Sequence, residues 1–278
     1  MNEMIRYENF MITLINILKN TFLYSLFVHM RDKLCAEHKI SRDIKVANIL
    51  QSLKEGTYFI QVGACDGITC DPIHSLIIQN NWSGILIEPV KYYFDQLKSN
   101  YNGMNNLIFE NVFIGENNII RDFYYIDSNV ASEMNGEGPH NNWAYGQGSF
   151  SKEVITREIK SNAFRGKWYR DNIPRFISSI RSIKVPSITI NDLIKKYAPQ
   201  KVDLLQIDAQ GFDYNIIKSI DFDLWKPKII NFESSMFPKE KKSCNLFLKK
   251  KGYAIIEYGC DMLAVLNETG RAQTNDKK

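Results

Sequence analysis

The apolar residues from position 58 onward fall into short runs, and most of these runs end in a polar or glycine-rich turn. Five runs are almost uniformly apolar, and they cover residues 58–62, 85–87, 107–109, 202–207 and 228–232. Such runs are typical of strands that are buried on both faces, which requires helices above and below the sheet. Helical patterns follow the runs, so the sequence predicts a doubly wound α/β fold around a mainly parallel sheet.

The pattern changes twice after the third run. Residues 127–184 are rich in Asn, Gly, Ser and aromatics without a clear period, which predicts an insertion or lid segment. Residues 253–257 and 262–266 are two runs joined by a turn too short for a crossover helix, which predicts a C-terminal antiparallel hairpin. Residues 50–266 would form one domain, and the polar residues 267–278 a flexible tail.

Residues 1–49 predict an N-terminal helical extension. Apolar residues recur at helical spacing within residues 10–30, at Ile12, Ile15, Leu18, Phe22 and Leu26. Four polar residues interrupt the same stretch, at Asn16, Lys19, Asn20 and His29. A packed amphipathic helix is therefore favoured over an integral membrane span, and peripheral contact with a membrane is left open.

Composition narrows the class of protein. The hydrophobic fraction of 44%, the charged fraction of 24% and the net charge of +4 are those of an ordinary globular protein, and they imply no nucleic-acid partner. The five cysteines contain no CxxC pair, which argues against a disulfide framework and predicts a reducing, cytoplasmic location. Neither the cysteines nor the four histidines show ligand spacing, so we expect no metal.

A glycine loop follows the first apolar run. Gly63 and Gly67 would let the backbone pass close to a ligand, and Asp71 and Pro72 suit the N-cap and first position of a following helix. The loop has the geometry of a cofactor cradle, although G-x-x-x-G differs from the G-x-G-x-x-G of dinucleotide enzymes. A plain strand-to-helix turn is the alternative.

Three acidic residues stand at the carboxyl ends of predicted strands, where ligands collect in open parallel sheets. Glu88 ends the second run about 20 residues beyond the glycine loop, where an acid binds ribose hydroxyls in doubly wound folds. Asp208 ends the fourth run and would orient a cationic cofactor or accept a proton. Glu233 ends the fifth run and would bind substrate or serve as a loop carboxylate, while Asp213 would cap the next helix.

Together these motifs resemble the FkbM family of S-adenosylmethionine-dependent methyltransferases over residues 57–266. The similar segments are residues 59–67 (FIQVGACDG), 87–89 (IEP), 185–193 (VPSITINDL) and 202–213 (VDLLQIDAQGFD). The resemblance implies a Rossmann-like class I methyltransferase fold with a seven-stranded sheet, S-adenosylmethionine as cofactor and a hydroxyl on a sugar, glycan or other natural product as acceptor.

The resemblance also implies the cofactor site. The methionine part would lie at the two glycines, the ribose on Glu88, the adenine near the exit of the third strand, and Asp208 beside the methyl group. The full set is Gly63, Ala64, Asp66, Gly67, Glu88, Pro89, Asn111, Val112 and Asp208. The chain departs from the family at Gln210, where a second acid is frequent, and at Asp66, where Asn is common.

Candidate residues for the acceptor lie in the same region and in the long segment. Asp208 is the first candidate for general base and His140 the second. Substrate contacts are expected from Trp143, Tyr145, Gln210 and Glu233, because aromatic rings stack on sugars and polar groups bind hydroxyls. Five basic residues in this segment would bind an anionic acceptor or form a solvated face: Arg165, Lys167, Arg170, Arg175 and Arg181.

Three other functions stay open. Gln210 and the helical extension would suit a non-catalytic module that binds cofactor and scaffolds partners. A nucleic-acid methyltransferase would be expected to carry an Asn/Asp-Pro-Pro-aromatic tip, where this chain has Gly211 and Phe212. An NAD-linked oxidoreductase ranks last. The sequence leaves the identity of the acceptor and the oligomeric state open.

Overall fold

A computed structural model describes residues 42–69, 71–134 and 144–267. The chain divides into two units between Ile49 and Leu50, and residues 42–51 are helical. The amphipathic pattern of residues 10–30 and most of the tail lie outside the described residues. Within the described part of the chain, no helix is long and apolar enough to cross a membrane.

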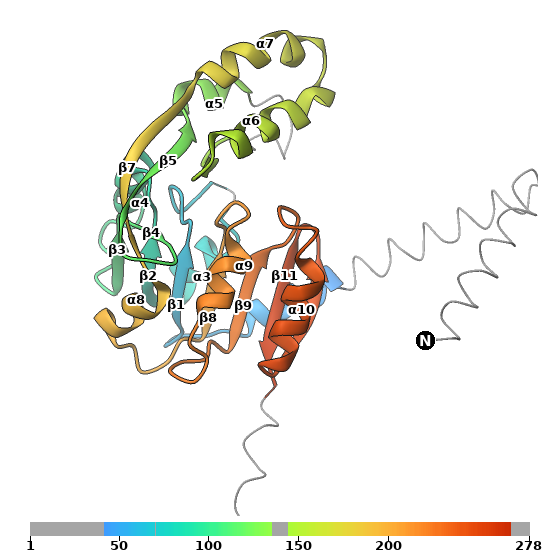
Figure 1. Ribbon diagram of the computed structural model, residues 1–278. Helices are drawn as coiled ribbons and strands as arrows, with labels where there is room; N and C mark the ends of the chain where they lie inside the picture. Colours follow the sequence, from blue (N-terminus) through green and yellow to red (C-terminus); the bar gives the residue numbers. More distant parts are fainter. Residues whose placement is uncertain (1–41, 70, 135–143, 268–278) are drawn as a thin grey trace, which may run out of the picture. The chain divides into compact units, whose positions relative to one another are not determined.

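The larger unit is built on a seven-stranded sheet with the strand order β10-β11-β9-β8-β1-β2-β3 (Figure 1). Strands β3, β2, β1, β8 and β9 pair in parallel, whereas β11 runs antiparallel to both β9 and β10. The mainly parallel sheet and its C-terminal hairpin are therefore confirmed. The strands are β1 (Tyr58–Val62), β2 (Ser83–Ile87), β3 (Leu107–Glu110), β8 (Leu204–Ile207), β9 (Ile229–Glu233), β10 (Tyr253–Tyr258) and β11 (Asp261–Leu266).

Helices pack on both faces of this sheet because its strands are apolar on both sides. On one face Ile60, Leu205 and Ile230 share a core with residues of α8, α9 and α10. On the other face the ring of Phe59 contacts that of Trp82, which follows α3. The helices are α3 (His74–Asn80), α4 (Lys91–Asn100), α8 (Ile190–Tyr197), α9 (Asp213–Ser219) and α10 (Lys241–Lys250).

A second layer stands between β3 and α8 in the sequence. Its four-stranded sheet has the order β4-β7-β5-β6, with β4 (Phe113–Ile114), β5 (Ile120–Ile126), β6 (Gly148–Ser149) and β7 (Ile180–Ile188). Its helices are α5 (Ser128–Met134), α6 (Lys152–Ser161), the 3-10 helix η1 (Asn162–Arg165) and α7 (Lys167–Ser178). Ile155, Tyr169 and Phe176 belong to a separate core in this layer. We refer to these strands and helices as the second layer.

The pattern of buried apolar runs did not predict β5 and β7, although they form a seven-residue antiparallel ladder. Both strands expose charged residues, among them Arg121, Asp122, Arg181 and Lys184, so neither reads as a buried run. Their ladder, together with α5, α6, η1 and α7, gives regular structure to much of a segment whose sequence has no clear period.

Candidate active site

Gly63 brings the ends of β1 and β8 together. Its φ is +78°, and a Cβ atom at this position would lie 1.9 Å from the backbone oxygen of Asp208. The amides of Gly63 and Ala64 both donate to the carbonyl of Ile87, each at 3.0 Å. Only glycine permits this close approach, so the tips of β1, β2 and β8 meet at one point.

Three of the predicted cofactor residues do not line the pockets but hold the surrounding loops in place through backbone contacts. Gly67 packs its backbone against Tyr101, and a Cβ there would lie 2.5 Å from the tyrosine ring. The Asp66 carboxylate accepts hydrogen bonds from the amides of Ile68 and Thr69, which fixes the turn after the glycine loop. Asn111 donates to the carbonyls of Glu88 and Pro89, and so holds the chain after β2.

Helix α3 begins two residues later than the sequence predicted. It starts at His74 with Ile73 as its N-cap. Asp71 still stabilises the start of the helix, because its Oδ1 accepts hydrogen bonds from the amides of Ile73 and His74 at 2.8 and 3.2 Å. Gln61 donates to the other oxygen of Asp71 at 3.1 Å, which ties the helix start to β1.

Glu88 lies at the tip of β2 with its carboxylate held by two backbone amides. Oε2 accepts from Cys65 at 3.0 Å and Oε1 from Val90 at 2.8 Å. The residue is only 5% exposed. Burial disfavours the ionised form and raises the pKa of Glu88 to about 8, against the opposing effect of the two amides.

Asp208 lies at the tip of β8 and faces open space. Gln210 donates to its Oδ1 at 2.8 Å, and Gln210 itself has a left-handed φ of +49°. The carboxylate reaches solvent, but it does so inside a concavity crowded by protein atoms. This crowding, with the nearby charge of Asp261, raises the pKa of Asp208 to about 6.

Two pockets meet at Asp208. Both are lined by Gly63, Glu88, Gly146, Asp208, Gln210 and Met236. Their cavity volumes are about 280 and 500 Å³, which is the scale of cofactor and small-molecule sites. We name them the aromatic pocket and the acidic pocket after the residues that distinguish them.

The acidic pocket is lined by five carboxylates, from Asp71, Glu88, Asp208, Glu233 and Asp261. Of the described residues that line it, none carries a positive charge. Burial raises the pKa of Glu233, and it raises that of Asp261 to about 6. Such a surface favours a cationic ligand, because a cation would relieve the repulsion between the carboxylates.

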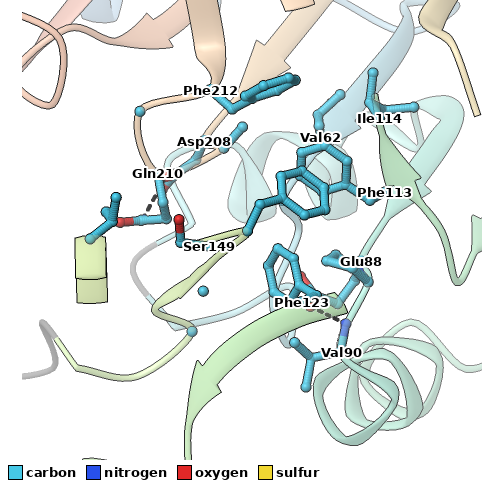
Figure 2. Close-up of a pocket in the computed structure, with 18 of the residues that line it drawn as sticks. Val62, Glu88, Val90, Phe113, Ile114, Phe123, Ser149, Asp208, Gln210 and Phe212 are labelled. Carbon is cyan, nitrogen blue, oxygen red and sulfur yellow. Dashed lines mark hydrogen bonds between the residues drawn. The ribbon is translucent and has the colours of Figure 1, made fainter. Parts of the chain in front are cut away.

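The aromatic pocket is walled by four phenylalanine rings from both layers. Figure 2 labels three of them, Phe113, Phe123 and Phe212. The ring of Phe113 lies 4.1 Å from that of Phe150 and 5.4 Å from that of Phe212, centroid to centroid. Phe123 completes the group, 5.5 Å from Phe150. Pro89 and Val112, two of the predicted cofactor residues, also line this pocket.

Three of the predicted substrate residues line the acidic pocket: Tyr145, Gln210 and Glu233. The Tyr145 hydroxyl donates to Gln96 at 2.8 Å, and it lies 3.2 Å from Asp66. His140 and Trp143 lie outside the described residues. Sequence reasoning missed the contribution of the second layer, which lines the aromatic pocket with residues of β4, β5, β6 and α6.

The chemistry of the lining fits S-adenosylmethionine, which carries a sulfonium and an ammonium group. The Oε1 atoms of Gln61 and Gln210 are buried without a hydrogen-bond partner among the described residues, and both side chains line the acidic pocket. Acceptor atoms and carboxylates suit ammonium donors, while the apolar surface of Pro89 and Val112 in the aromatic pocket suits a flat base. No group of three or more His, Cys, Asp or Glu side chains in the described ranges is arranged to hold a metal ion.

The strand order and the ligand pockets at the carboxyl edge define a Rossmann-like fold of the class I methyltransferases. The family model described as "Methyltransferase FkbM domain" matches residues 61–255, and the chain belongs to this family. The domain is an S-adenosylmethionine-dependent methyltransferase domain. A search of curated proteins found no match.

Solved structures resemble the chain only distantly. A methyltransferase FkbM from Methylobacillus flagellatus KT is 11% identical with a TM-score of 0.42, over 77% of this chain and 44% of that one. The chain thus spans less than half of that relative. A precorrin-6y C5,15-methyltransferase from Geobacter metallireducens GS-15 is 10% identical with a TM-score of 0.39, over 81% and 87%. A Methanococcus jannaschii fibrillarin pre-rRNA processing protein is 14% identical with a TM-score of 0.36, over 77% and 67%.

Proposed function

We propose that the protein methylates a hydroxyl of a sugar, glycan or other small natural product. The observation that carries the proposal is the position of Asp208. Its carboxylate stands where the acidic and aromatic pockets meet, with a pKa of about 6. A base with this pKa is mostly ionised at neutral pH and still accepts a proton effectively.

The cofactor would lie across the junction of the two pockets. The ammonium group of its zwitterionic amino-acid end would point to the carboxylates of the acidic pocket beside Gly63 and Ala64, and its ribose would hydrogen-bond Glu88. Pro89 and Val112 would contact the adenine in the aromatic pocket. The bound cofactor supplies an electrophilic methyl group on a positively charged sulfur.

The residues of the chain would orient the acceptor and remove its proton. Asp208 accepts the proton of the acceptor hydroxyl as the oxygen forms its new bond to carbon. Gln210 holds the Asp208 carboxylate through its 2.8 Å hydrogen bond, so that the free oxygen faces the acceptor. The rings of Phe113, Phe150 and Phe212 exclude water from the aromatic pocket, which favours transfer over side reactions.

The lining of the acidic pocket supports a hydroxylated acceptor. Tyr145, Gln210 and Glu233 place a hydroxyl, an amide and a carboxylate around one cavity. Sugars present several hydroxyls that both donate and accept hydrogen bonds, and groups of these kinds satisfy them. An amine acceptor would need no base once deprotonated, whereas a hydroxyl gains most from Asp208.

The proposal is tested by cofactor binding followed by turnover. Calorimetry with S-adenosylmethionine should show binding, and release of S-adenosylhomocysteine should appear with acceptors from a panel of hydroxylated sugars and natural products. Asp208→Asn should lose turnover, whereas Asp171→Asn, an exposed carboxylate paired with Lys167, should not.

The other outcomes separate the alternatives. Binding without turnover on any hydroxylated acceptor would favour a scaffolding module. Turnover only on DNA or RNA would favour a nucleic-acid methyltransferase. Full activity of Asp208→Asn would remove Asp208 as the base.

A further inference from the structure

Two arginines line the aromatic pocket on the side of the second layer. Arg121 stands on β5 and Arg157 on α6, and the same pocket is lined by Glu88 and Asp208 from the main sheet. At neutral pH Asp208 carries a negative charge on one wall, whereas Glu88, with a pKa of about 8, is mostly neutral, and the two arginines give the other wall a positive charge. A ligand that spans it meets both.

Arg121 is held in place by an aromatic ring. Its guanidinium lies 4.5 Å from the centroid of Phe150, and it has no ion pair among the described residues. A guanidinium that stacks on a ring keeps its N–H donors free at the edge of the plane. Phe150 itself packs against Phe113 and Phe212, so the ring that Arg121 contacts is held by the wall of the pocket.

Arg157 lies on the pocket side of α6. Ser151, Val154 and Arg157 are spaced three apart, and all three line the aromatic pocket. Ser151 is the N-cap of this ten-residue helix and accepts from the amide of Val154. The nearest ionic partner of Arg157 is Glu158 at 3.7 Å, which is too long for a hydrogen bond, and the Arg157 side chain is 68% exposed.

Three other cations of the second layer form closer ion pairs with carboxylates. Arg175 pairs with Glu133 at 2.5 Å, Arg181 with Asp127 at 3.2 Å and Lys184 with Asp122 at 2.9 Å. Two of these, Arg175 and Arg181, belong to the basic group that the sequence associated with an anionic acceptor. Neither of them lines the pocket. Among the described residues, Arg121 has no ion pair, and the ion pair of Arg157 with Glu158 is long at 3.7 Å.

We propose that Arg121 and Arg157 form an anion subsite, which binds a carboxylate or phosphate on the molecule whose hydroxyl faces Asp208. This inference rests on the proposed function and names the class of its acceptor: an acidic sugar, a sugar phosphate or a similar hydroxylated anion. The charge on the two walls would orient such an acceptor, with its anion on the second layer and its hydroxyl at the carboxylate.

The subsite is tested by binding of matched probes to the full-length protein in the presence of S-adenosylhomocysteine. The probes are glucose, glucose 6-phosphate, glucuronate and inorganic phosphate. We expect the three anions to bind at least tenfold more tightly than glucose. A hydrogen bond to a charged group is worth about tenfold to 100-fold in affinity, so Arg121→Gln and Arg157→Gln should each weaken anion binding by about that factor.

The variants carry their own controls. Arg121→Lys keeps the positive charge and should retain part of the affinity for the anionic probes. Arg175→Gln, outside the pocket, should leave that affinity unchanged. Both pocket arginines are exposed, so thermal unfolding and S-adenosylmethionine affinity should match the wild type. Equal binding of all four probes, no anion binding at millimolar concentration, or unchanged anion affinity in both glutamine variants would overturn the subsite. Failure to bind S-adenosylmethionine would instead overturn the proposed function.

Discussion

The two pockets that meet at Asp208 are built by different parts of the molecule. The acidic pocket takes its five carboxylates from the turn before α3 and from the ends of the main strands, whereas the aromatic pocket takes three of its four phenylalanines, two serines and both arginines from the part of the chain that forms the second layer. In our account the main sheet holds the cofactor and the acceptor hydroxyl at Asp208, and the second layer binds the anion of the acceptor. Cofactor binding and acceptor choice should therefore respond to different substitutions.

The largest effect is expected at Gly63, on which the junction of the two pockets depends. Gly63→Ala would place a Cβ 1.9 Å from the Asp208 backbone oxygen, so the β1 and β8 tips must separate. We expect a loss of more than about 3 kcal/mol of unfolding free energy and no measurable cofactor binding, from chemical denaturation and calorimetry.

Gly56→Ala is the matched control. Gly56 has a φ of +79°, close to that of Gly63, and nothing lies within 4 Å of its added Cβ. This variant should lose only about 1 kcal/mol from backbone strain and keep its cofactor affinity. Similar losses in both variants would show that strain, and not the close approach of β1 to β8, makes glycine necessary at position 63.

The second largest effect is expected on the rate of methyl transfer, without an effect on stability. Asp208→Asn keeps the shape of the side chain but removes the base, so kcat should fall by about 100-fold to 10,000-fold once an acceptor is known. The measurement is release of S-adenosylhomocysteine at saturating cofactor. A fall in cofactor affinity with unchanged kcat would assign Asp208 to cofactor binding only.

The pH dependence should give a smaller effect of known sign. Protonation disables a base, and the pKa of Asp208 is about 6, so kcat/KM for the acceptor should rise about tenfold between pH 5 and pH 7.5 and then level off. Assays at saturating cofactor test this. A profile that falls over the same range would contradict a carboxylate base, and Asp208→Asn should abolish the rising limb.

The smallest effect concerns the second layer. Phe150→Leu keeps an apolar side chain but removes the ring beneath Arg121, and exposed cation–π contacts are worth about two- to fivefold in affinity. Anion binding should weaken by that factor while S-adenosylmethionine affinity stays unchanged. Phe164→Leu, at a ring that is 79% exposed outside both pockets, is the control. If Phe150→Leu lost cofactor affinity to the same extent, the claim that the second layer acts on the acceptor and not on the cofactor would be wrong.

The sequence predicted the main sheet because its strands are buried on both faces and read as apolar runs. The same reasoning located Glu88 and Asp208, since parallel strands place their carboxyl ends at one edge. It did not predict β5 and β7, whose exposed charges hide the strand pattern, nor the two pocket arginines, Arg121 on β5 and Arg157 on α6. Such contacts depend on tertiary packing, which local periodicity does not encode.

Within the glycine loop, residue type alone could not separate pocket lining from loop support. Gly63 lines both pockets, while Gly67 packs against Tyr101 and Asp66 binds backbone amides. Both glycines have positive φ values and look equivalent in the sequence. Their difference appears only when the neighbouring strands and α4 are in place.

The most direct test of the division between the pockets is a crystal structure of the protein with S-adenosylhomocysteine. Our account predicts the amino-acid end of the ligand among the carboxylates of the acidic pocket, its ribose on Glu88 and its base against Pro89 and Val112, with the arginine side of the aromatic pocket left free. Density for the ligand against Arg121 and Arg157, or away from Glu88, would contradict it.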